Sequence, residues 1–211
     1  MRGLAVRLLA ALSLSAAVAC GVDTPSSEVG LGTAVLTYHA SAADFGAYST
    51  YAIVTQIAVY QEIPGQPSVI YQPAPEILGA IESNLNARGY VKVAEIDPAN
   101  PVPLPAGTDL AVVVAALQGT DYIYYPCDWW PGWGYPGTGC DLPYEFIPYL
   151  TGALLIELGD LKNAAATAPN IQIPWAAVAY AVLTTSSAAN AQIAVDAVNQ
   201  AFAQSPYLQT P

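Results

Sequence analysis

An unbroken apolar run at residues 110–117 constrains the fold of this chain more than any other feature of its sequence. The run reads Leu-Ala-Val-Val-Val-Ala-Ala-Leu. Eight residues is the length of a strand, and a continuous apolar run without alternation is typical of a strand that is buried on both faces. We therefore predict a core strand here that is buried on both faces.

Other segments have the composition of strands or the periodicity of helices. The further predicted strands are residues 33–39, 50–60, 90–96, 154–161 and 173–183, which are rich in β-branched and aromatic residues or alternate in polarity. Apolar residues at helical spacing predict two helices, with Ile77, Leu78, Ile81 and Leu85 in the first and Ile193, Val195, Val198 and Phe202 in the second. Prolines and glycine between residues 64 and 75 predict a loop.

Local signals place the ends of the helices. Pro75 suits the first turn of a helix and Gly89 its end, while Ser186 or Ser187 can cap the second helix and Pro206 ends it. Strands in runs together with two helices predict an α+β fold. We expect a two-layer sandwich in which both helices cover one face of a mixed, mostly antiparallel sheet of five or six strands.

The N-terminus has the order of an export signal. Arg2 and Arg7 form a positive region, residues 8–14 form an apolar run, and small residues lead directly to Cys20. The apolar run is shorter than the roughly 20 residues that span a bilayer as a helix. Ala-Val-Ala before the cysteine resembles the lipobox of bacterial lipoproteins, in which the cysteine receives lipid, although Ala stands at the third residue before it where Leu is usual.

We therefore predict that residues 1–19 are a lipoprotein signal peptide, that Cys20 is lipidated, and that residues 20–32 are a flexible tether before a single domain at residues 33–208. The alternative is plain secretion with an unmodified Cys20. Two or three acyl chains would hold the protein at a membrane, because one chain alone binds only marginally. The predicted location is the cell envelope, and Gly21 favours the outer membrane, facing the periplasm or the cell surface.

The chain carries few charges, and most of them are acidic. Charged residues make up 10% of the sequence, against about 25% in typical domains. Once the signal is removed, the cations Arg88, Lys92 and Lys162 face sixteen carboxylates, which gives a net charge of −13. Nucleic-acid binding needs cations at the phosphates, so this class of partner is excluded. The same balance argues against electrostatic docking on an anionic membrane surface.

Two further cysteines, Cys127 and Cys140, flank a short segment. In an oxidising compartment they are free to pair, and a disulfide that closes a loop of this size contributes roughly 3 kcal/mol to stability in the chain-entropy model. A thiolate metal site is the alternative, but two cysteines so far apart, without a nearby histidine, form a weak zinc signature. We predict the disulfide, no metal and no cofactor.

Residues 122–149 form an aromatic segment rich in glycine and proline, for which we predict a long loop without regular elements. Its candidate binding residues are Trp129, Trp130, Trp133 and Tyr135. Exposed aromatic side chains on such a loop could stack on sugar rings, anchor a protein partner or enter a membrane interface. They could equally fold back over the open face of the sheet. These alternatives stay open from the sequence alone.

The sequence offers little for catalysis. His39 is the only histidine, and general acid–base chemistry usually needs two tuned groups near one another. Asp44, Asp109, Glu157 and Asp160 fall near predicted strand ends, where turn or cap roles are expected. No nucleophile elbow, phosphate-binding glycine loop or two-histidine zinc motif is present. We predict no catalytic residue and no enzymatic activity, and a hydrolase that uses His39 is the least favoured hypothesis.

A series of weak motifs in a fixed order resembles a large bacterial family of lipoproteins known as domain of unknown function 4136. After the lipobox the motifs are Asp44-Phe45-x-x-Tyr48-x-Thr50-Tyr51, Leu85-x-x-Arg88-Gly89-Tyr90, Thr108-Asp109-Leu110 with its apolar run, the aromatic segment, a strand that ends in Asp160, and a strand that begins with Trp175. The resemblance covers residues 36–208. The family usually has Trp where Ile53 stands and Gly where Ala177 stands.

The resemblance implies an α/β lipoprotein domain in the cell envelope and implies no activity. We expect a non-catalytic binding or scaffolding protein that is attached to a membrane by its lipid. An envelope protein or a glycan is the expected partner. A glycan-binding module that uses Trp129, Trp130 and Trp133 is the alternative. The sequence does not predict an oligomeric state.

Overall fold

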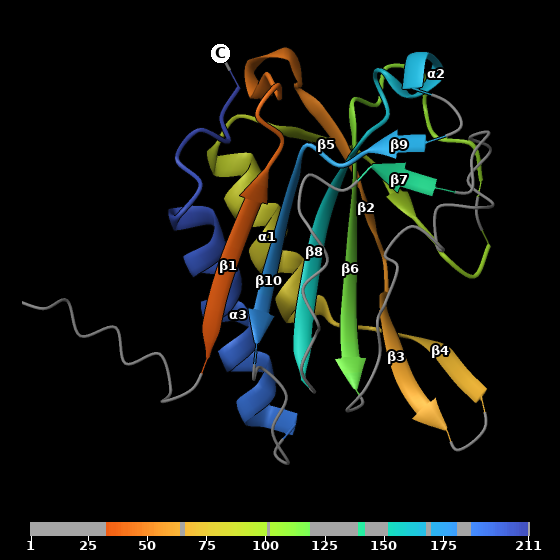
Figure 1. Cartoon of the computed structure of the whole chain (residues 1–211), viewed down its shortest axis with the longest axis vertical. Helices are drawn as coiled ribbons and strands as arrows, with labels where there is room; N and C mark the ends of the chain where they lie inside the picture. Colours follow the sequence, from red (N-terminus) through yellow and green to blue (C-terminus); the bar gives the residue numbers. More distant parts are fainter. Residues whose placement is uncertain are drawn as a thin grey trace, which may run out of the picture.

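The computed structural model describes residues 33–63, 66–100, 102–118, 139–141, 152–167, 170–180 and 187–210. The main sheet has eight strands (Figure 1): β1 (Ala34–His39), β2 (Thr50–Val54), β3 (Ile57–Ile63), β4 (Gln66–Gln72), β5 (Val91–Ile96), β6 (Leu110–Gln118), β8 (Ala153–Asp160) and β10 (Trp175–Tyr180). A small parallel sheet joins β7 (Gly139–Asp141) to β9 (Asn170–Gln172). The helices are α1 (Pro75–Ala87), α2 (Ala164–Thr167) and α3 (Ser187–Ala203), with a 3₁₀ turn η1 (Phe45–Ala47).

The main sheet is mixed, and it divides beyond its centre. The strands run in the order β1-β10-β8-β6-β2-β5, and β3 also pairs with β6. From β1 to β6 every pair is antiparallel, whereas β2 and β3 run parallel to β6. β2 pairs with the first part of β6 and β3 with the last part. Beyond them, β5 pairs with β2 and β4 pairs with β3, so the sheet ends in two separate edges on this side and in β1 on the other.

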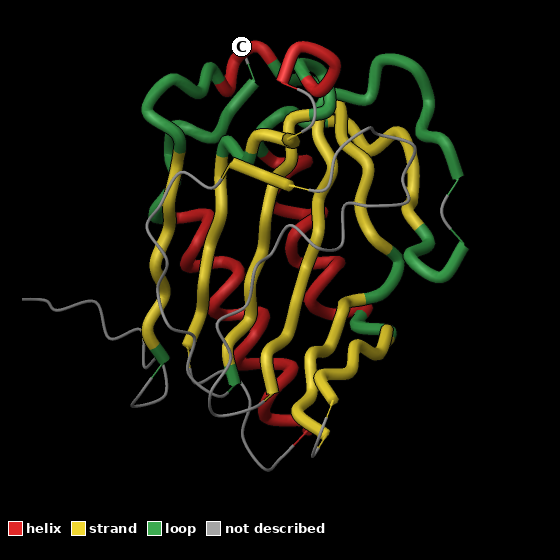
Figure 2. Tube along the Cα trace, turned by 45° about the vertical axis from the view of Figure 1, so that its right-hand side comes forward, coloured by secondary structure: helices red, strands yellow, loops and turns green. Residues whose placement is uncertain are grey.

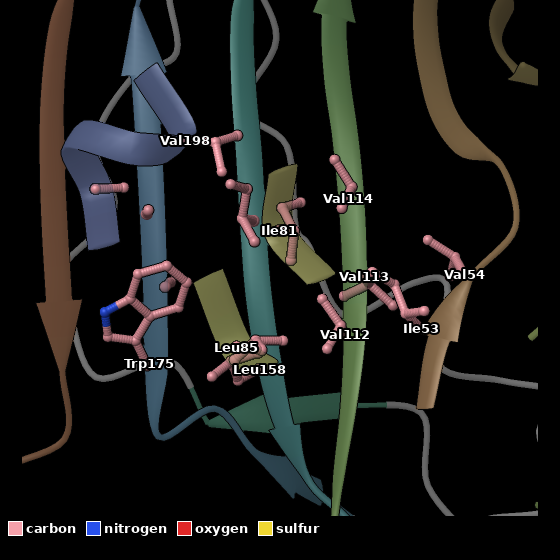
Figure 3. Packing of buried hydrophobic residues seen from close by; sticks show 14 of the residues in the cluster. Ile53, Val54, Ile81, Leu85, Val112, Val113, Val114, Leu158, Trp175 and Val198 are labelled. Atoms are coloured by element: carbon pink, nitrogen blue, oxygen red, sulfur yellow. The ribbon is translucent and has the colours of Figure 1, made fainter. Parts of the chain in front are cut away.

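Helices α1 and α3 cover one face of the sheet, as predicted (Figure 2). The main core lies between them and the strands. In Figure 3, Leu85 of α1 lies against Leu158 of β8, Ile81 of α1 lies between β8 and β6, and Trp175 of β10 lies beside α3. All four side chains are fully buried. Burial of a Leu or Ile side chain stabilises a fold by about 1.5–3 kcal/mol relative to leaving it exposed, so this layer provides the main driving force for folding.

The face of the sheet opposite the helices is also apolar. A second buried cluster consists of Ala115, Leu117, Ala153, Leu155 and Val178, with Tyr38, Tyr60 and Tyr180 packed against it. Residues Leu110–Leu117 of β6 are all buried, whichever face they point to. The prediction that this run is a core strand buried on both faces is confirmed.

Four expectations about the strands were wrong. The described sheet has eight strands rather than five or six. Residues 50–60 form two strands, because β2 and β3 turn apart at residues 55–56 to reach different neighbours. Strand β4 lies in the segment predicted as a loop, and β7 lies in the aromatic segment, for which no regular element was expected.

The helix boundaries agree with the local signals. Pro75 is the first residue of α1. Gly89 follows the helix with a φ of +92°, in the left-handed region that glycine adopts without steric cost. Helix α3 begins at Ser187 and ends three residues before Pro206. Among the described residues, no helix combines the length and the apolar character that a membrane crossing requires.

Candidate functional site

Two carboxylates, Asp109 and Asp160, meet at one end of the sheet. Asp109 immediately precedes β6, and Asp160 is the last residue of β8. The antiparallel register pairs Leu110 with Asp160, which brings the two acidic residues onto neighbouring strands. We call these two residues and the groups that bond to them the strand-end cluster. Its other members are Tyr48, Ser49, Thr50, Lys162 and Asn163.

The Asp109 carboxylate ties the segment before β2 to β6. Its Oδ2 accepts hydrogen bonds from the Ser49 amide at 2.7 Å, the Ser49 hydroxyl at 3.0 Å and the Thr50 amide at 3.2 Å. Lys162 Nζ lies 3.8 Å from the other oxygen. Burial alone would raise the pKa of Asp109, but the donors from Ser49 and Thr50 and the charge of Lys162 outweigh it, so the pKa is lowered. The group therefore stays ionised.

The Asp160 carboxylate has a comparable set of donors. Its Oδ2 accepts the Tyr48 hydroxyl at 3.0 Å and the Asn163 side-chain amide at 2.7 Å, and its Oδ1 accepts the Asn163 backbone amide at 2.9 Å. Burial and the nearby Asp160 charge raise the pKa of Tyr48, which keeps its hydroxyl protonated as a donor. The cap role expected for Asp160 matches this geometry.

Both carboxylates thus accept several hydrogen bonds from the protein itself. Lys162 also donates to the carbonyl of Ala47, so the segment around η1 is bound on two sides. The arrangement joins a loop to the ends of two strands. Sequence reasoning identified Asp109 and Asp160 separately but missed their proximity, because it follows from the pairing of β6 with β8, which no local pattern specifies.

Of the other candidate acid–base residues, His39 and Glu157 lie apart from this cluster, whereas the charge of Asp44 contributes to the raised pKa of Tyr48 within it. His39 ends β1, where its ring centroid is 4.5 Å from that of Tyr207 and its Nδ1 lies 3.3 Å from the Ala40 carbonyl. Asp44 precedes η1. Glu157 is buried in the middle of β8, opposite Val113 of β6. Residues three apart in a strand point to opposite faces, so Glu157 and Asp160 do not share a site.

Most of the other predicted site residues lie outside the described residues. These are Cys20, Cys127, Trp129, Trp130, Trp133 and Tyr135. Cys140 lies in β7, where the backbone alone is described. Lipidation, the disulfide and the aromatic binding residues therefore stay predictions. Within the described part of the chain, no three His, Cys, Asp or Glu residues are grouped in a way that could hold a metal ion.

The β3–β4 ribbon presents an apolar edge that sequence reasoning missed. Val69, Ile70 and Tyr71 of β4 are 42%, 37% and 39% exposed. Successive residues of a strand point to opposite faces, so both faces of the ribbon carry apolar side chains. Among the described strands, β4 pairs with β3 alone, so it forms one outer edge of the sheet (lower right in Figure 1). We call Val69, Ile70 and Tyr71 the apolar edge.

Comparisons with known proteins give one family and several similar folds. The family model for a domain of unknown function, DUF4136, matches residues 35–207. The chain is similar to the crystal structure of a DUF4136 family protein from Bacteroides thetaiotaomicron, with 26% identity and a TM-score of 0.64, over 84% of this chain and 97% of that chain. It is also similar to PelC from Paraburkholderia phytofirmans, solved as a dodecamer, with 18% identity and a TM-score of 0.39, over 85% and 99% of the two chains. No curated protein matches.

Proposed function

The chain belongs to the DUF4136 family, as its motifs indicated, and on that premise we propose that it is a lipid-anchored protein of the cell envelope that binds another envelope protein without catalysing a reaction. The observation that carries the binding role is the apolar edge. Three consecutive large apolar side chains are exposed there, on a ribbon that the rest of the described domain does not cover. Contiguous exposed apolar surface of this kind marks interaction sites in soluble domains.

The form of the apolar edge favours a protein partner. β4 is an edge strand, so its outer N–H and C=O groups can pair with an added strand. Its sequence, Gln-Pro-Ser-Val-Ile-Tyr-Gln, carries no charge, although the chain as a whole is strongly acidic. An extended, apolar segment of a partner could pair with β4 and pack against Val69, Ile70 and Tyr71. β3 is itself paired with β6 through residues 58–61, so a strand added to β4 would extend a sheet that is already formed.

The N-terminal sequence supports the anchor, and the strand-end cluster supports a non-catalytic role. Cys20 follows a positive, an apolar and a small-residue region in that order. A general acid or base must be able to exchange a proton with a substrate. The carboxylates of Asp109 and Asp160 instead accept three hydrogen bonds each from protein donors. Their positions fit a domain whose loops are held rigid for binding.

The anchor is tested by the intact mass of the mature protein, extracted from membranes, before and after reduction. We expect the mass of residues 20–211 plus an acylated glycerol on Cys20. If Cys127 and Cys140 are paired, this mass should rise by about two hydrogens on reduction. The same measurement on the Cys20→Ser variant provides the control. An unmodified mass in soluble material would reject lipid anchoring and support plain secretion.

The binding site is tested by photo-crosslinking in cells from a probe placed at Tyr71. We expect one discrete adduct with an envelope protein, which is lost in a Val69→Ser/Ile70→Ser variant of unchanged melting temperature. Val102 is also exposed but lies in the loop before β6, so a probe placed there is the matched control. Equal adducts from the two probes, or no adduct from Tyr71, would reject the apolar edge as the binding site.

Glycan binding by the aromatic segment is the alternative. Tryptophan rings stack on sugar rings, and Trp129, Trp130 and Trp133 occur within five residues. A glycan array probed with the mature protein and with a triple alanine variant separates the two hypotheses. Binding that disappears in the triple variant, while the Tyr71 adduct is absent, would favour the glycan. The absence of any signal above background with the unaltered protein would reject it.

A further inference from the structure

Strand β1 is a regular sheet edge with an exposed apolar residue at its centre. It pairs with β10 without interruption, from Ala34 opposite Tyr180 to His39 opposite Trp175. No described strand pairs with its outer side. Leu36 is 41% exposed and points to the face of the sheet opposite the helices, since Val35, its neighbour, belongs to the main core.

The hydrogen-bond pattern shows which groups of β1 point outward. Ala40 directly follows β1, and its amide donates to the Pro174 carbonyl at 3.0 Å. The main-chain groups of this even-numbered residue therefore point toward β10. In an antiparallel pair the bonded residues alternate. The odd-numbered residues Val35, Thr37 and His39 therefore direct their N–H and C=O groups away from β10, toward the outer edge.

Of the described edges of the sheet, β5 carries features that discourage strand addition, whereas β1 carries none of them. β5 has a register shift opposite Tyr51 and Ala52, and Lys92 on it bridges Glu82 and Glu95 at 3.0 and 3.1 Å. Bulges and charged side chains are the usual protection of an edge strand. β4 carries Pro67. β1, with the sequence Ala-Val-Leu-Thr-Tyr-His, has no Lys, Arg, Asp, Glu, Pro or bulge.

We propose that β1 pairs with β1 of a second copy of this chain, antiparallel, about a two-fold axis that passes near Leu36 perpendicular to the sheet. Leu36 then faces Leu36 of the partner subunit, and Val35 faces Thr37 of the partner subunit. The axis preserves the faces of the sheet, so the two main sheets become one and all four long helices lie on the same side. An interface of this kind is self-complementary, as two-fold interfaces must be.

The symmetry of the edge favours a second copy as the occupant, because the outward groups of Val35 and Thr37 lie on either side of Leu36 and bond one another across the axis. Charge permits this contact at β1. Each mature chain carries a net charge of −13, so two copies repel wherever their carboxylates approach. β1 has no charged side chain, so two copies can meet there without placing carboxylates opposite one another. The carboxylates of the two chains then repel one another only over long distances, and salt screens this repulsion beyond about 8 Å at physiological ionic strength. We therefore expect the dimer to be strengthened by salt.

The arrangement is also compatible with anchoring of both copies in one bilayer. In the proposed register the two Ala34 residues are offset by four residues along the strands, which corresponds to roughly 14 Å. The thirteen residues 21–33 reach up to about 45 Å when extended. Both chains can therefore reach the same membrane. The dimer does not depend on the anchor, and it does not use the apolar edge of β4.

The first test is the mass of the mature protein in solution, by analytical ultracentrifugation at micromolar concentrations. We expect twice the mass of one chain, and a dissociation constant that falls as salt is raised. Leu36→Lys would place two ammonium groups opposite one another and should leave only single chains. Val93→Lys on β5 is the matched control, because Val93 is also 41% exposed at a sheet edge, and it should remain a dimer.

The second test locates the seam. Leu36 would form a non-hydrogen-bonded pair with its copy, in which the Cα atoms are about 4.5 Å apart, within the range that a disulfide bridges. Mild oxidation of Leu36→Cys should give a disulfide-linked dimer, whereas Val93→Cys should not. A single-chain mass for the unaltered protein, or equal dimerisation of the two lysine variants, would overturn the proposal. Loss of the Tyr71 adduct would not affect it.

Discussion

A few buried or partly buried polar residues hold the segments between the strands of this domain in place. Asp109 and Asp160 bind the loop around η1 and the turn after β8, and Arg88 binds the end of α3 through the Phe202 carbonyl at 2.8 Å. Hydrogen bonds to charged groups contribute about 1.5–3 kcal/mol each, more than neutral ones. These residues lie in the family motifs, and the contacts that they make give each of them a structural role.

Replacement of Asp109 by Asn should lower the free energy of unfolding by about 2 kcal/mol at neutral pH, because the amide cannot replace a charged acceptor of three hydrogen bonds. Urea denaturation measures the change. Asp196→Asn is the control: Asp196 is exposed on α3 and bonds only to Gln192, so its replacement should change stability by less than about 0.5 kcal/mol.

The same carboxylate predicts a pH dependence. Its pKa is lowered in the folded protein, below the 3.8 of the unfolded chain. It therefore contributes stability that is complete above pH 3.8 and is lost as the pH falls from there through the folded pKa. The stability difference between the unaltered protein and Asp109→Asn should shrink over this acidic range. A difference that stayed constant between neutral pH and pH 2 would contradict the assignment.

Gly89 is a second position where a single substitution should change stability, because there is no room for a Cβ atom. Its φ is +92°, and a Cβ there would lie 2.1 Å from Thr210 Oγ1. Gly89→Ala should cost about 1–3 kcal/mol and displace the C-terminal residues, which bond to the Arg88 carbonyl. Gly79→Ala is the counterpart, because Gly79 lies within α1 and nothing lies within 4 Å of its Cβ position. It should stabilise by up to about 1 kcal/mol. Thermal denaturation compares the two variants.

At the scale of elements, an aromatic contact and a buried hydrogen bond help to dock the C-terminal end of α3 on β10. The rings of Trp175 and Phe202 lie 5.2 Å apart, and the Trp175 indole donates to the Ser205 hydroxyl at 2.9 Å in the buried core. Tyr207 and Leu208 follow and return the chain toward β1. The C-terminal residues thus complete the layer of helices that covers β1 and β10.

Trp175→Phe should destabilise the protein by about 2–3 kcal/mol, since it removes buried volume and the donor to Ser205. In a double-mutant cycle with Ser205→Ala, the coupling energy should be about 1 kcal/mol, because each single variant removes the same hydrogen bond. Chemical denaturation of the four proteins gives this value. If the changes in the free energy of unfolding of the two single variants simply added in the double variant, the indole hydrogen bond would contribute nothing to stability.

Elements with strong local signals were predictable, and those defined by their neighbours were not. α1 was placed by Pro75 and Gly89, and β6 by its continuous apolar run. β4 was missed because Pro67 and the residues around it are typical of a loop; a proline is tolerated there because β4 is an edge strand, opposite Glu62 of β3. The proximity of Asp109 and Asp160 required the register of β6 and β8, which the sequence does not state.

At the scale of the whole molecule, the sheet has two uncharged edges at opposite ends, β1 and β4. The helices cover one face and a second apolar cluster lies on the other, so the edges are the places where the main-chain groups of the sheet stay accessible. The two proposals assign different occupants to them, a second copy at β1 and another envelope protein at β4. They therefore predict that one dimer presents two partner sites.

This division gives a stoichiometry that can be measured. The cross-linked complex from Tyr71 should contain two copies of this chain and two of the partner when it is isolated intact, because the two β4 strands of the dimer lie at its far ends. The Leu36→Lys variant should reduce this to one copy of each. Native mass spectrometry distinguishes the two masses, and a single partner for each dimer would show that the two edges interfere.

The position of β1 in the chain also bears on biosynthesis. β1 is the first strand to be made, yet its only described neighbour in the sheet is β10, near the other end of the chain. A ribosome delivers the N-terminus first, so β1 must wait for almost the entire domain before it can be incorporated. If the chain is exported and acylated as proposed, the lipid is attached beside the strand that joins the sheet last. A product truncated before β10 would then still be held at the membrane, with β1 unable to dock.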